Sequence, residues 1–105
     1  MVLLSEEEID ARLGALEGWT REDRFIQRTF KFPAFLKAIE FINRVAELAE
    51  EADHHPDLYN VWRTVTLKFT THDAGGLTER DFNMASKINV LDVNAPPEEP
   101  GPPSE

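Results

Sequence analysis

The 105-residue sequence contains no cysteine, and this absence excludes several kinds of chemistry at once. Without a thiol the chain can form no disulfide, bind no metal through thiolate and use no cysteine nucleophile. Basic residues are also scarce, since 11 Lys and Arg stand against 20 Asp and Glu. The net charge of −9 argues against a nucleic-acid partner, because phosphate binding requires a concentrated Lys/Arg surface.

Long apolar runs are missing as well. The first four residues, Met1 to Leu4, are apolar but are followed by Ser5 and three glutamates, which is unlike a secretory signal. No apolar run approaches the roughly 18–20 residues that a membrane helix needs. We therefore expect a cytoplasmic protein with no membrane partner. Five of the seven prolines lie in residues 95–105, so we predict one domain over residues 1–94 and a disordered Pro/Glu-rich tail over 95–105.

The first half of the domain predicts a helix and a pair of strands. Ser5 and Glu8 have the spacing of a capping box, which indicates a short helix from about residue 5 to residue 13. Residues 19–32 then alternate between apolar and polar, with Arg28 interrupting the apolar face. This pattern is typical of a β-hairpin.

A long amphipathic helix is predicted over residues 33–52, with Pro33 in its first turn. Apolar residues recur at helical spacing at Phe35, Ile39, Ile42, Ala46 and Ala49. Phe41 and Val45 lie beside this stripe, so the helix has apolar residues on more than one side. We expect such a surplus face to be covered by another copy of the chain.

Two further strands, about 59–62 and 65–71, precede a last helix in which Thr78 and Asp81 repeat the capping-box spacing. The predicted order is α-β-β-α-β-β-α. We expect an α+β fold, a four-stranded antiparallel sheet with three helices packed on one face.

The three histidines all lie at element boundaries. His54 and His55 follow the long helix, and His72 follows a strand that could pair with the strand after His55. An adjacent pair of histidines on a loop is most often a solvated surface feature. The third histidine changes that reading, because the pairing would bring three imidazoles to one end of the sheet.

Two kinds of chemistry compete for such a site. Three histidines and a carboxylate could hold zinc and a water, although adjacent side chains generally point in different directions. General acid–base catalysis without metal needs only that the imidazoles flank a substrate. Glu50, one helical turn before His54, could orient that imidazole or be a solvated acid. Asp81 is expected to cap a helix and shape the site, and Arg80 to be a surface residue.

Taken together, these motifs resemble the pterin-4a-carbinolamine dehydratases. The residues that carry the resemblance, in order, are Asp53-His54-His55-Pro56, Tyr59-Asn60-Val61-Trp62 and Thr70-Thr71-His72-Asp73-Ala74-Gly75-Gly76-Leu77-Thr78-Glu79-Arg80-Asp81. The match runs from about Leu16 to about Val90. It departs from the family's usual residues at Trp62, where Tyr is common, and at Leu58, where animal members have Trp.

The resemblance implies a hydro-lyase that dehydrates 4a-hydroxytetrahydropterin to quinonoid dihydropterin, recycling the cofactor of aromatic amino-acid hydroxylases, without metal or coenzyme. By carry-over, His54 and His72 would do the acid–base work and His55 would orient the pterin. Glu50, Asp53, Pro56 and Asp81 would bind or orient the substrate. The family also implies a homodimer or homotetramer. The alternative function is a non-catalytic interaction module, because some proteins with this fold bind a transcription factor or assist assembly.

Overall fold

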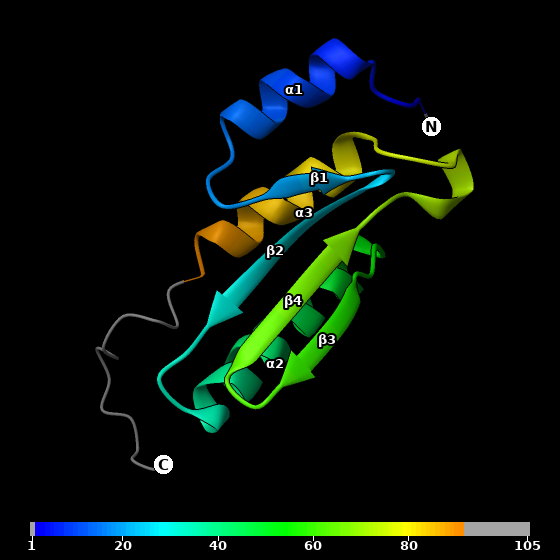
Figure 1. Ribbon diagram of the computed structural model, residues 1–105. Helices are drawn as coiled ribbons and strands as arrows, with labels where there is room; N and C mark the ends of the chain where they lie inside the picture. The colour runs from blue at the N-terminus through cyan, green and yellow to red at the C-terminus, as the bar shows by residue number, and fades with distance from the viewer. Residues whose placement is uncertain (1, 92–105) are drawn as a thin grey trace.

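The chain folds around one four-stranded antiparallel sheet, drawn in Figure 1 from the computed structural model, which describes residues 2–91. The elements in chain order are α1 (Glu6–Gly14), β1 (Thr20–Glu22), β2 (Phe25–Lys31), α2 (Phe35–Ala52), β3 (Asp57–Val61), β4 (Thr64–Phe69), the short 3-10 helix η1 (His72–Ala74) and α3 (Glu79–Asn89). This order confirms the predicted α+β fold. The predicted tail, 95–105, and the end of the predicted domain at residue 94 lie outside the described residues.

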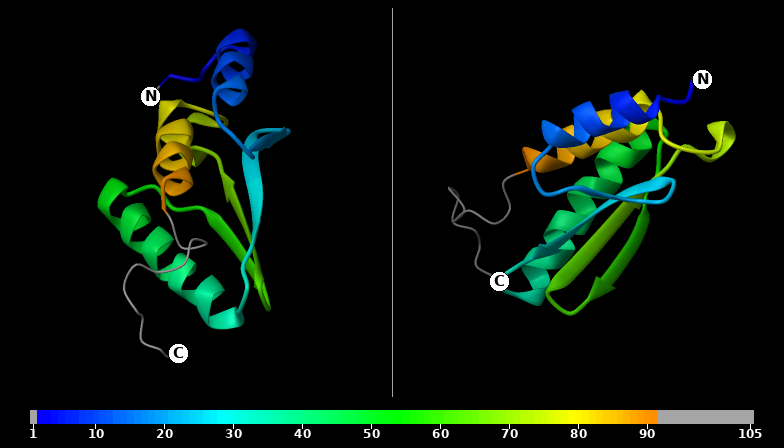
Figure 2. Two further views of the ribbon diagram at one scale, coloured as in Figure 1. Left: turned by 90° about the vertical axis from the view of Figure 1, so that its left-hand side faces the viewer. Right: turned by 45° about the horizontal axis from the view of Figure 1, so that its top comes forward.

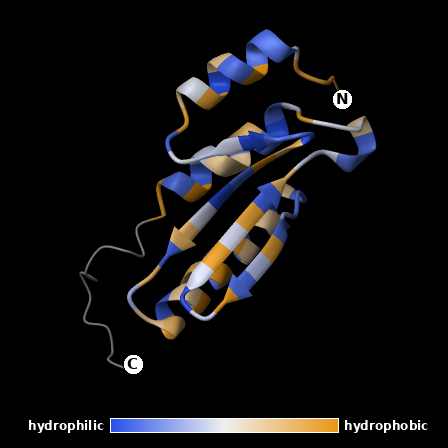
Figure 3. Cartoon of the chain, viewed as in Figure 1, coloured by the Kyte–Doolittle hydropathy of each residue, from blue (hydrophilic) through white to orange (hydrophobic). Residues whose placement is uncertain are grey.

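The strand order is β1-β2-β4-β3, so β1 and β3 form the two edges of the sheet. Along β4, Val65, Leu67 and Phe69 are fully buried, and the residues between them are half-buried. This alternation follows from the two-residue period of a strand, and Figure 3 shows the matching alternation of hydropathy along β4. The helices α2 and α3 lie on the buried side (Figure 2), and α1 lies beyond β1, alongside α3. No helix of residues 2–91 covers the other face.

Both predicted capping boxes are present. The backbone N–H of Glu8 donates to Ser5 Oγ and the backbone N–H of Ser5 donates to the Glu8 carboxylate, at 3.1 and 2.8 Å. At the start of α3 the Thr78 backbone N–H donates to Asp81 Oδ2 at 2.9 Å. These boxes satisfy backbone donors that a helix leaves unpaired in its first turn. Within residues 2–91, no helix is long and apolar enough to cross a membrane.

The side of the long helix α2 that is buried is formed by a different set of residues from the one predicted. Its buried residues are Ala38, Phe41, Val45 and Ala49; Ala49 was on the expected stripe, and Phe41 and Val45 were expected beside it. The Phe41 ring packs against Phe30 and Phe32 of the sheet layer, with centroids 4.6 and 4.9 Å apart. Phe41 and Val45 are therefore not left over for another copy of the chain. Phe35 is instead 44% exposed, and Pro33 precedes the N-cap Ala34 rather than lying in the first turn.

The interrupting Arg28 of β2 is held between the sheet and the end of α3. Its guanidinium donates to the Glu17 carbonyl at 3.1 Å and to Asn89 Oδ1 at 2.8 Å, and it lies over the Phe30 ring. Gly18 passes directly beside it with φ +88°, and a Cβ there would lie 2.5 Å from the guanidinium. The positive φ favours glycine at this position, and a Cβ would also force the Arg28 guanidinium to shift.

Candidate active site

One end of the sheet brings the predicted site residues together. In the antiparallel pairing of β3 with β4, Asp57 lies opposite Lys68. Residues 54–56 therefore enter β3 at the end where residues 70–72 leave β4, as Figure 1 shows. The first residues of α3 reach the same end through hydrogen bonds to Thr71. The register thus accounts for the expected approach of the two histidine segments.

His54 points into the protein at this end. Its Nε2 lies 2.7 Å from Asp81 Oδ1, and its side chain is 8% exposed. The imidazole stacks on the Phe69 ring, with centroids 5.8 Å apart and planes 18° apart. A carboxylate on one side and an aromatic ring on the other hold this imidazole in one orientation.

Asp81 is fully buried and joins a chain of hydrogen bonds whose direction can be assigned. The Arg80 backbone N–H can only donate, and it donates to Thr78 Oγ1. Thr71 Oγ1 donates to Asp81 Oδ2 at 2.8 Å, so the bond between the two threonine hydroxyls must be donated by Thr78. Asp81 then accepts from Thr71, from the Thr78 backbone and from His54.

This assignment sets the tautomer of the neutral His54 ring. A carboxylate only accepts hydrogen bonds, so Nε2 carries the hydrogen and Nδ1 carries the lone pair. Every fully buried side-chain nitrogen and oxygen in residues 2–91 has a hydrogen-bond partner. Nδ1 has none, so it reaches the surface. In the neutral ring, the nitrogen that reaches the surface is therefore the one without a hydrogen, and the buried Asp81 carboxylate lies at the other nitrogen.

His55 points outward and pairs with Glu50. Its Nε2 lies 2.7 Å from Glu50 Oε2, with side-chain exposures of 54% and 78%. Of the two interpretations of Glu50, the contact with His54 is not made, and Glu50 is an exposed acid at the end of the helix. The reason is that α2 ends at Ala52 and Asp53 adopts a left-handed conformation with φ 53°, so the helical spacing does not continue to His54.

The loop before the histidines is tied to α3 by Arg80, a contact that the sequence analysis missed. The Arg80 guanidinium donates to the carbonyls of Ala52 and Asp53 at 3.1 and 2.7 Å. These carbonyls belong to the end of α2, where a cation is favoured. Asp53 contributes its backbone to the site in this way. Pro56 is half-buried and lies between His55 and the first residue of β3.

His72 is the first residue of η1 and is exposed. Its ring makes an edge-to-face contact with the half-buried Phe25 ring, with centroids 6.5 Å apart and planes at 76°. Phe25 is a second residue that the sequence analysis missed. The three imidazoles are thus gathered at one end of the sheet, but in residues 2–91 none is hydrogen-bonded to another, and each has a different partner.

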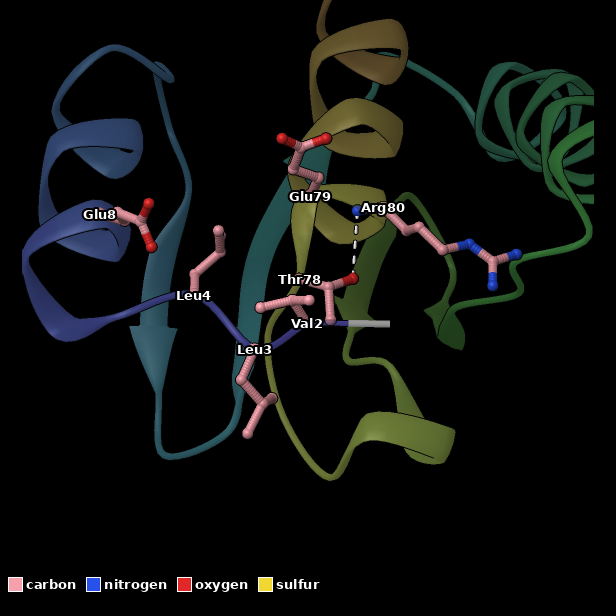
Figure 4. Close-up of a pocket in the computed structure, with 7 residues that line it drawn as sticks. All are labelled: Val2, Leu3, Leu4, Glu8, Thr78, Glu79 and Arg80. Carbon is pink, nitrogen blue, oxygen red and sulfur yellow. Dashed lines mark hydrogen bonds between the residues drawn. The ribbon is translucent and has the colours of Figure 1, made fainter.

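A hollow of about 440 Å³ lies beside the site, between the N-terminal segment and the start of α3. It is lined by Val2, Leu3, Leu4, Glu8, Thr78, Glu79 and Arg80 (Figure 4). The Arg80 side chain extends away from Leu4 and Glu8 in this view. No histidine lines the hollow. In the part of the chain that the structure describes, no three His, Asp or Glu side chains are grouped as metal ligands would be.

Fold and site together define a small α+β domain with a histidine-bearing site at one end of its sheet. The chain belongs to the pterin 4 alpha carbinolamine dehydratase family, whose model matches residues 2–91. The resemblance inferred from the motifs is confirmed by this match.

Curated relatives carry the same dehydratase name, given provisionally. A relative from Roseiflexus sp. (strain RS-1) is 56% identical over 88 residues, which are 84% of this chain and 95% of that protein. One from Mycolicibacterium smegmatis is 52% identical over 91 residues, covering 87% and 97%. One from Sulfolobus acidocaldarius is 46% identical over 88 residues, covering 84% and 97%.

Two solved structures share the fold. The transcriptional coactivator/pterin dehydratase from Brucella melitensis is 38% identical, with a TM-score of 0.83 over 90% of this chain and 100% of the other. A pterin dehydratase-like protein described as a RuBisCO assembly factor in the alpha-carboxysome has a TM-score of 0.62, 19% identity and coverage of 71% and 89%. At that identity, this second similarity shows the fold alone.

Proposed function

We propose that the protein dehydrates 4a-hydroxytetrahydropterin to quinonoid dihydropterin and water, by histidine acid–base catalysis. The observation that carries the proposal is the pair of His54 and the buried Asp81, which leaves Nδ1 of His54 free to accept a proton at the surface. Membership of the dehydratase family supports the choice of substrate.

The reaction requires one proton to leave the pterin and one to be delivered. The ring nitrogen beside the carbinol carbon loses its proton, the carbon–oxygen bond breaks, and the hydroxyl takes up a proton to leave as water. His54 Nδ1 accepts the first proton, and the resulting imidazolium is stabilised by Asp81 at 2.7 Å. A general base and a general acid each contribute about 10²–10⁴-fold.

His72 is assigned to the leaving hydroxyl and His55 to holding the pterin. His72 is exposed and makes no side-chain hydrogen bond within residues 2–91, so both of its nitrogens remain available to a substrate. His55 is exposed but is already bonded to Glu50, an arrangement suited to a fixed contact with the substrate. Asp53 and Pro56 set the course of the loop that carries this residue.

The test is a stopped-flow absorbance assay of 4a-hydroxytetrahydropterin dehydration, run with and without EDTA. We expect acceleration that survives EDTA and falls about 10²-fold or more in His54→Ala and in His72→Ala, with residual turnover still measurable. Unchanged turnover in either variant would contradict the assigned roles. Loss of activity in EDTA would favour a zinc site, and no acceleration by folded wild-type protein would favour the interaction module.

We also propose that the protein is a homo-oligomer that associates through β3. This edge strand and the turn after it carry exposed large hydrophobic residues, namely Leu58, Tyr59, Val61 and Trp62. Trp62 is 68% exposed and is held in the left-handed region at φ 54°, an unusual conformation for an aromatic residue. A second copy pairing along β3 would cover both the open edge and these side chains.

A further inference from the structure

We propose that Phe25 is a positioning residue for His72. This inference rests on the proposed dehydratase function, in which the His72 imidazole must lie beside the leaving hydroxyl. It concerns a residue 47 positions away in the sequence that takes part in no motif of the histidine segments.

The contact between the two rings has the geometry of an aromatic pair. The centroids lie 6.5 Å apart with the planes at 76°, within the range of edge-to-face contacts. Phe25 is the first residue of β2 and lies opposite Glu22 of β1. It comes from the sheet, whereas His72 comes from the segment that follows β4. The pair therefore ties the start of η1 to the β1–β2 hairpin.

Phe25 is itself held in place by Lys68. The Lys68 ammonium lies over the Phe25 ring, 4.9 Å from its centroid, and 3.6 Å from Glu22 Oε1. A cation over an aromatic face is attracted to the ring, and the carboxylate holds the cation there. Residues of β4 and β1 therefore restrain the Phe25 ring that contacts the His72 imidazole.

His72 needs such a contact more than the other two histidines do. His54 is fixed by Asp81 and His55 by Glu50, each through a hydrogen bond of 2.7 Å. His72 makes no side-chain hydrogen bond within residues 2–91, and an exposed side chain without one samples several rotamers. The Phe25 contact restricts that sampling, and correct placement of a reacting group accounts for a large part of catalysis.

An aromatic partner, unlike a carboxylate, leaves both imidazole nitrogens free of a hydrogen bond. Asp81 selects one tautomer of His54 because it can only accept a hydrogen bond. Phe25 offers no hydrogen-bonding atom, so both nitrogens of His72 stay open to gain or lose a proton. This suits a group that gives a proton to the leaving hydroxyl and must then recover one.

The experiment compares Phe25→Leu with Phe25→Tyr, which keeps the ring, in the stopped-flow assay. We expect Phe25→Leu to lower kcat/KM about three- to tenfold, the size of a lost aromatic pair, and Phe25→Tyr to restore it. Phe35→Leu is the matched control and should leave kcat/KM unchanged. Phe35 is an exposed aromatic residue at the N-terminal end of α2, whereas the histidines follow its C-terminal end. In a His72→Ala background, Phe25→Leu should cause no further loss. The inference is overturned if Phe25→Leu lowers kcat/KM equally in the wild-type and His72→Ala proteins, or if it lowers kcat/KM in neither.

A second measurement separates this inference from the function on which it rests. The measurement is the ¹H–¹³C NMR spectrum of the free protein, in which the signals missing from His72→Ala are assigned to the His72 imidazole. Phe25→Leu should change the chemical shifts of these signals and leave those of His54 and His55 unchanged. An unmoved His72 signal overturns the inference whether or not the protein is active. A moved signal in a wild-type protein without turnover refutes the dehydratase proposal while the ring contact stands.

Discussion

Nε2 of His54 lies 2.7 Å from Oδ1 of Asp81, and the two residues join the end of α2 to the first turn of α3. The same carboxylate caps α3, because its Oδ2 accepts from the Thr78 backbone. One buried carboxylate therefore serves both a helix end and an imidazole. The position of the proposed base is thereby coupled to the capping of α3.

The first prediction is that Asp81→Asn lowers kcat by about 10²-fold or more while the protein stays folded. The Thr78 backbone N–H and the Thr71 hydroxyl both donate toward Oδ2, so the Asn oxygen must take that place. Its NH₂ group then faces His54 and donates to Nε2. This moves the ring hydrogen to Nδ1, which can no longer accept a proton.

Stopped-flow turnover checks this prediction, together with thermal unfolding to confirm the fold. Asp10→Asn, an exposed acid of α1, is the control and should keep the wild-type rate. A fully active Asp81→Asn protein would show that the tautomer of His54 does not matter for the reaction.

The sequence predicted best those features that depend on neighbouring residues. The capping boxes at Ser5 and Thr78 involve partners three residues away, and both are present. The strand pairs followed from alternation of apolar and polar side chains. The buried side of α2 was predicted only in part, because its apolar residues cover more than one side. The choice among them is made by contacts of Phe41 with the distant Phe30 and Phe32.

In the site, too, local features were predicted from the sequence and distant contacts were not. The motifs identified the three histidines, but not the partner of each. Asp81 is 27 residues from His54, and Phe25 is 47 from His72, so no local spacing relates them. A contact of Glu50 with His54, one of the two alternatives for Glu50, would need a helix that continues past Ala52, whereas Asp53 turns the chain away. Such partners depend on tertiary packing, which one sequence does not reveal.

A second prediction concerns the loop that carries the histidines. Arg80→Met removes two hydrogen bonds, to the carbonyls of Ala52 and Asp53, and should lower the free energy of unfolding by about 1–2 kcal/mol. Hydrogen exchange should report the local effect. The amides of Asp53 and His54, which donate to the last turns of α2, should exchange faster than in wild type.

Arg12→Met is the control for that experiment, because it removes another arginine contact with α3, namely the exposed ion pair of Arg12 with Glu79. Its loss should leave the exchange of these two amides unchanged. Equal protection of the loop in Arg80→Met and wild type would show that Arg80 does not hold it.

A third prediction follows from the tie between α1 and β1. Arg21 donates hydrogen bonds to the Glu6 carboxylate, and these hydrogen bonds, together with the charge of Arg21, lower the pKa of Glu6 below its ordinary value. A carboxyl with a lowered pKa in the folded protein contributes stability above its unfolded pKa, and that contribution disappears as the pH falls through the folded pKa. Glu6 is exposed, so the effect is small.

Thermal unfolding of Glu6→Gln and wild type at several pH values checks this. We expect Glu6→Gln to melt slightly lower than wild type at pH 7 and the difference to close as the pH is lowered toward 3. Glu7→Gln, which removes the exposed acid next to Glu6 in the same helical turn, is the matched control for the loss of a charge at the start of α1. A difference that stays constant from pH 7 to pH 3 would exclude the Glu6 carboxylate as its source.

The last prediction tests self-association through β3. Light scattering should give wild-type protein a mass that is a multiple of 12.0 kDa at micromolar concentration. Tyr59→Asp should reduce that mass, because a charge on the exposed edge strand opposes pairing with a second copy. Thr20→Asp places the same charge on β1, the other edge of the sheet, and should leave the mass unchanged. A wild-type mass of 12.0 kDa would refute the oligomer, and a reduced mass in Thr20→Asp alone would place the interface on β1 instead.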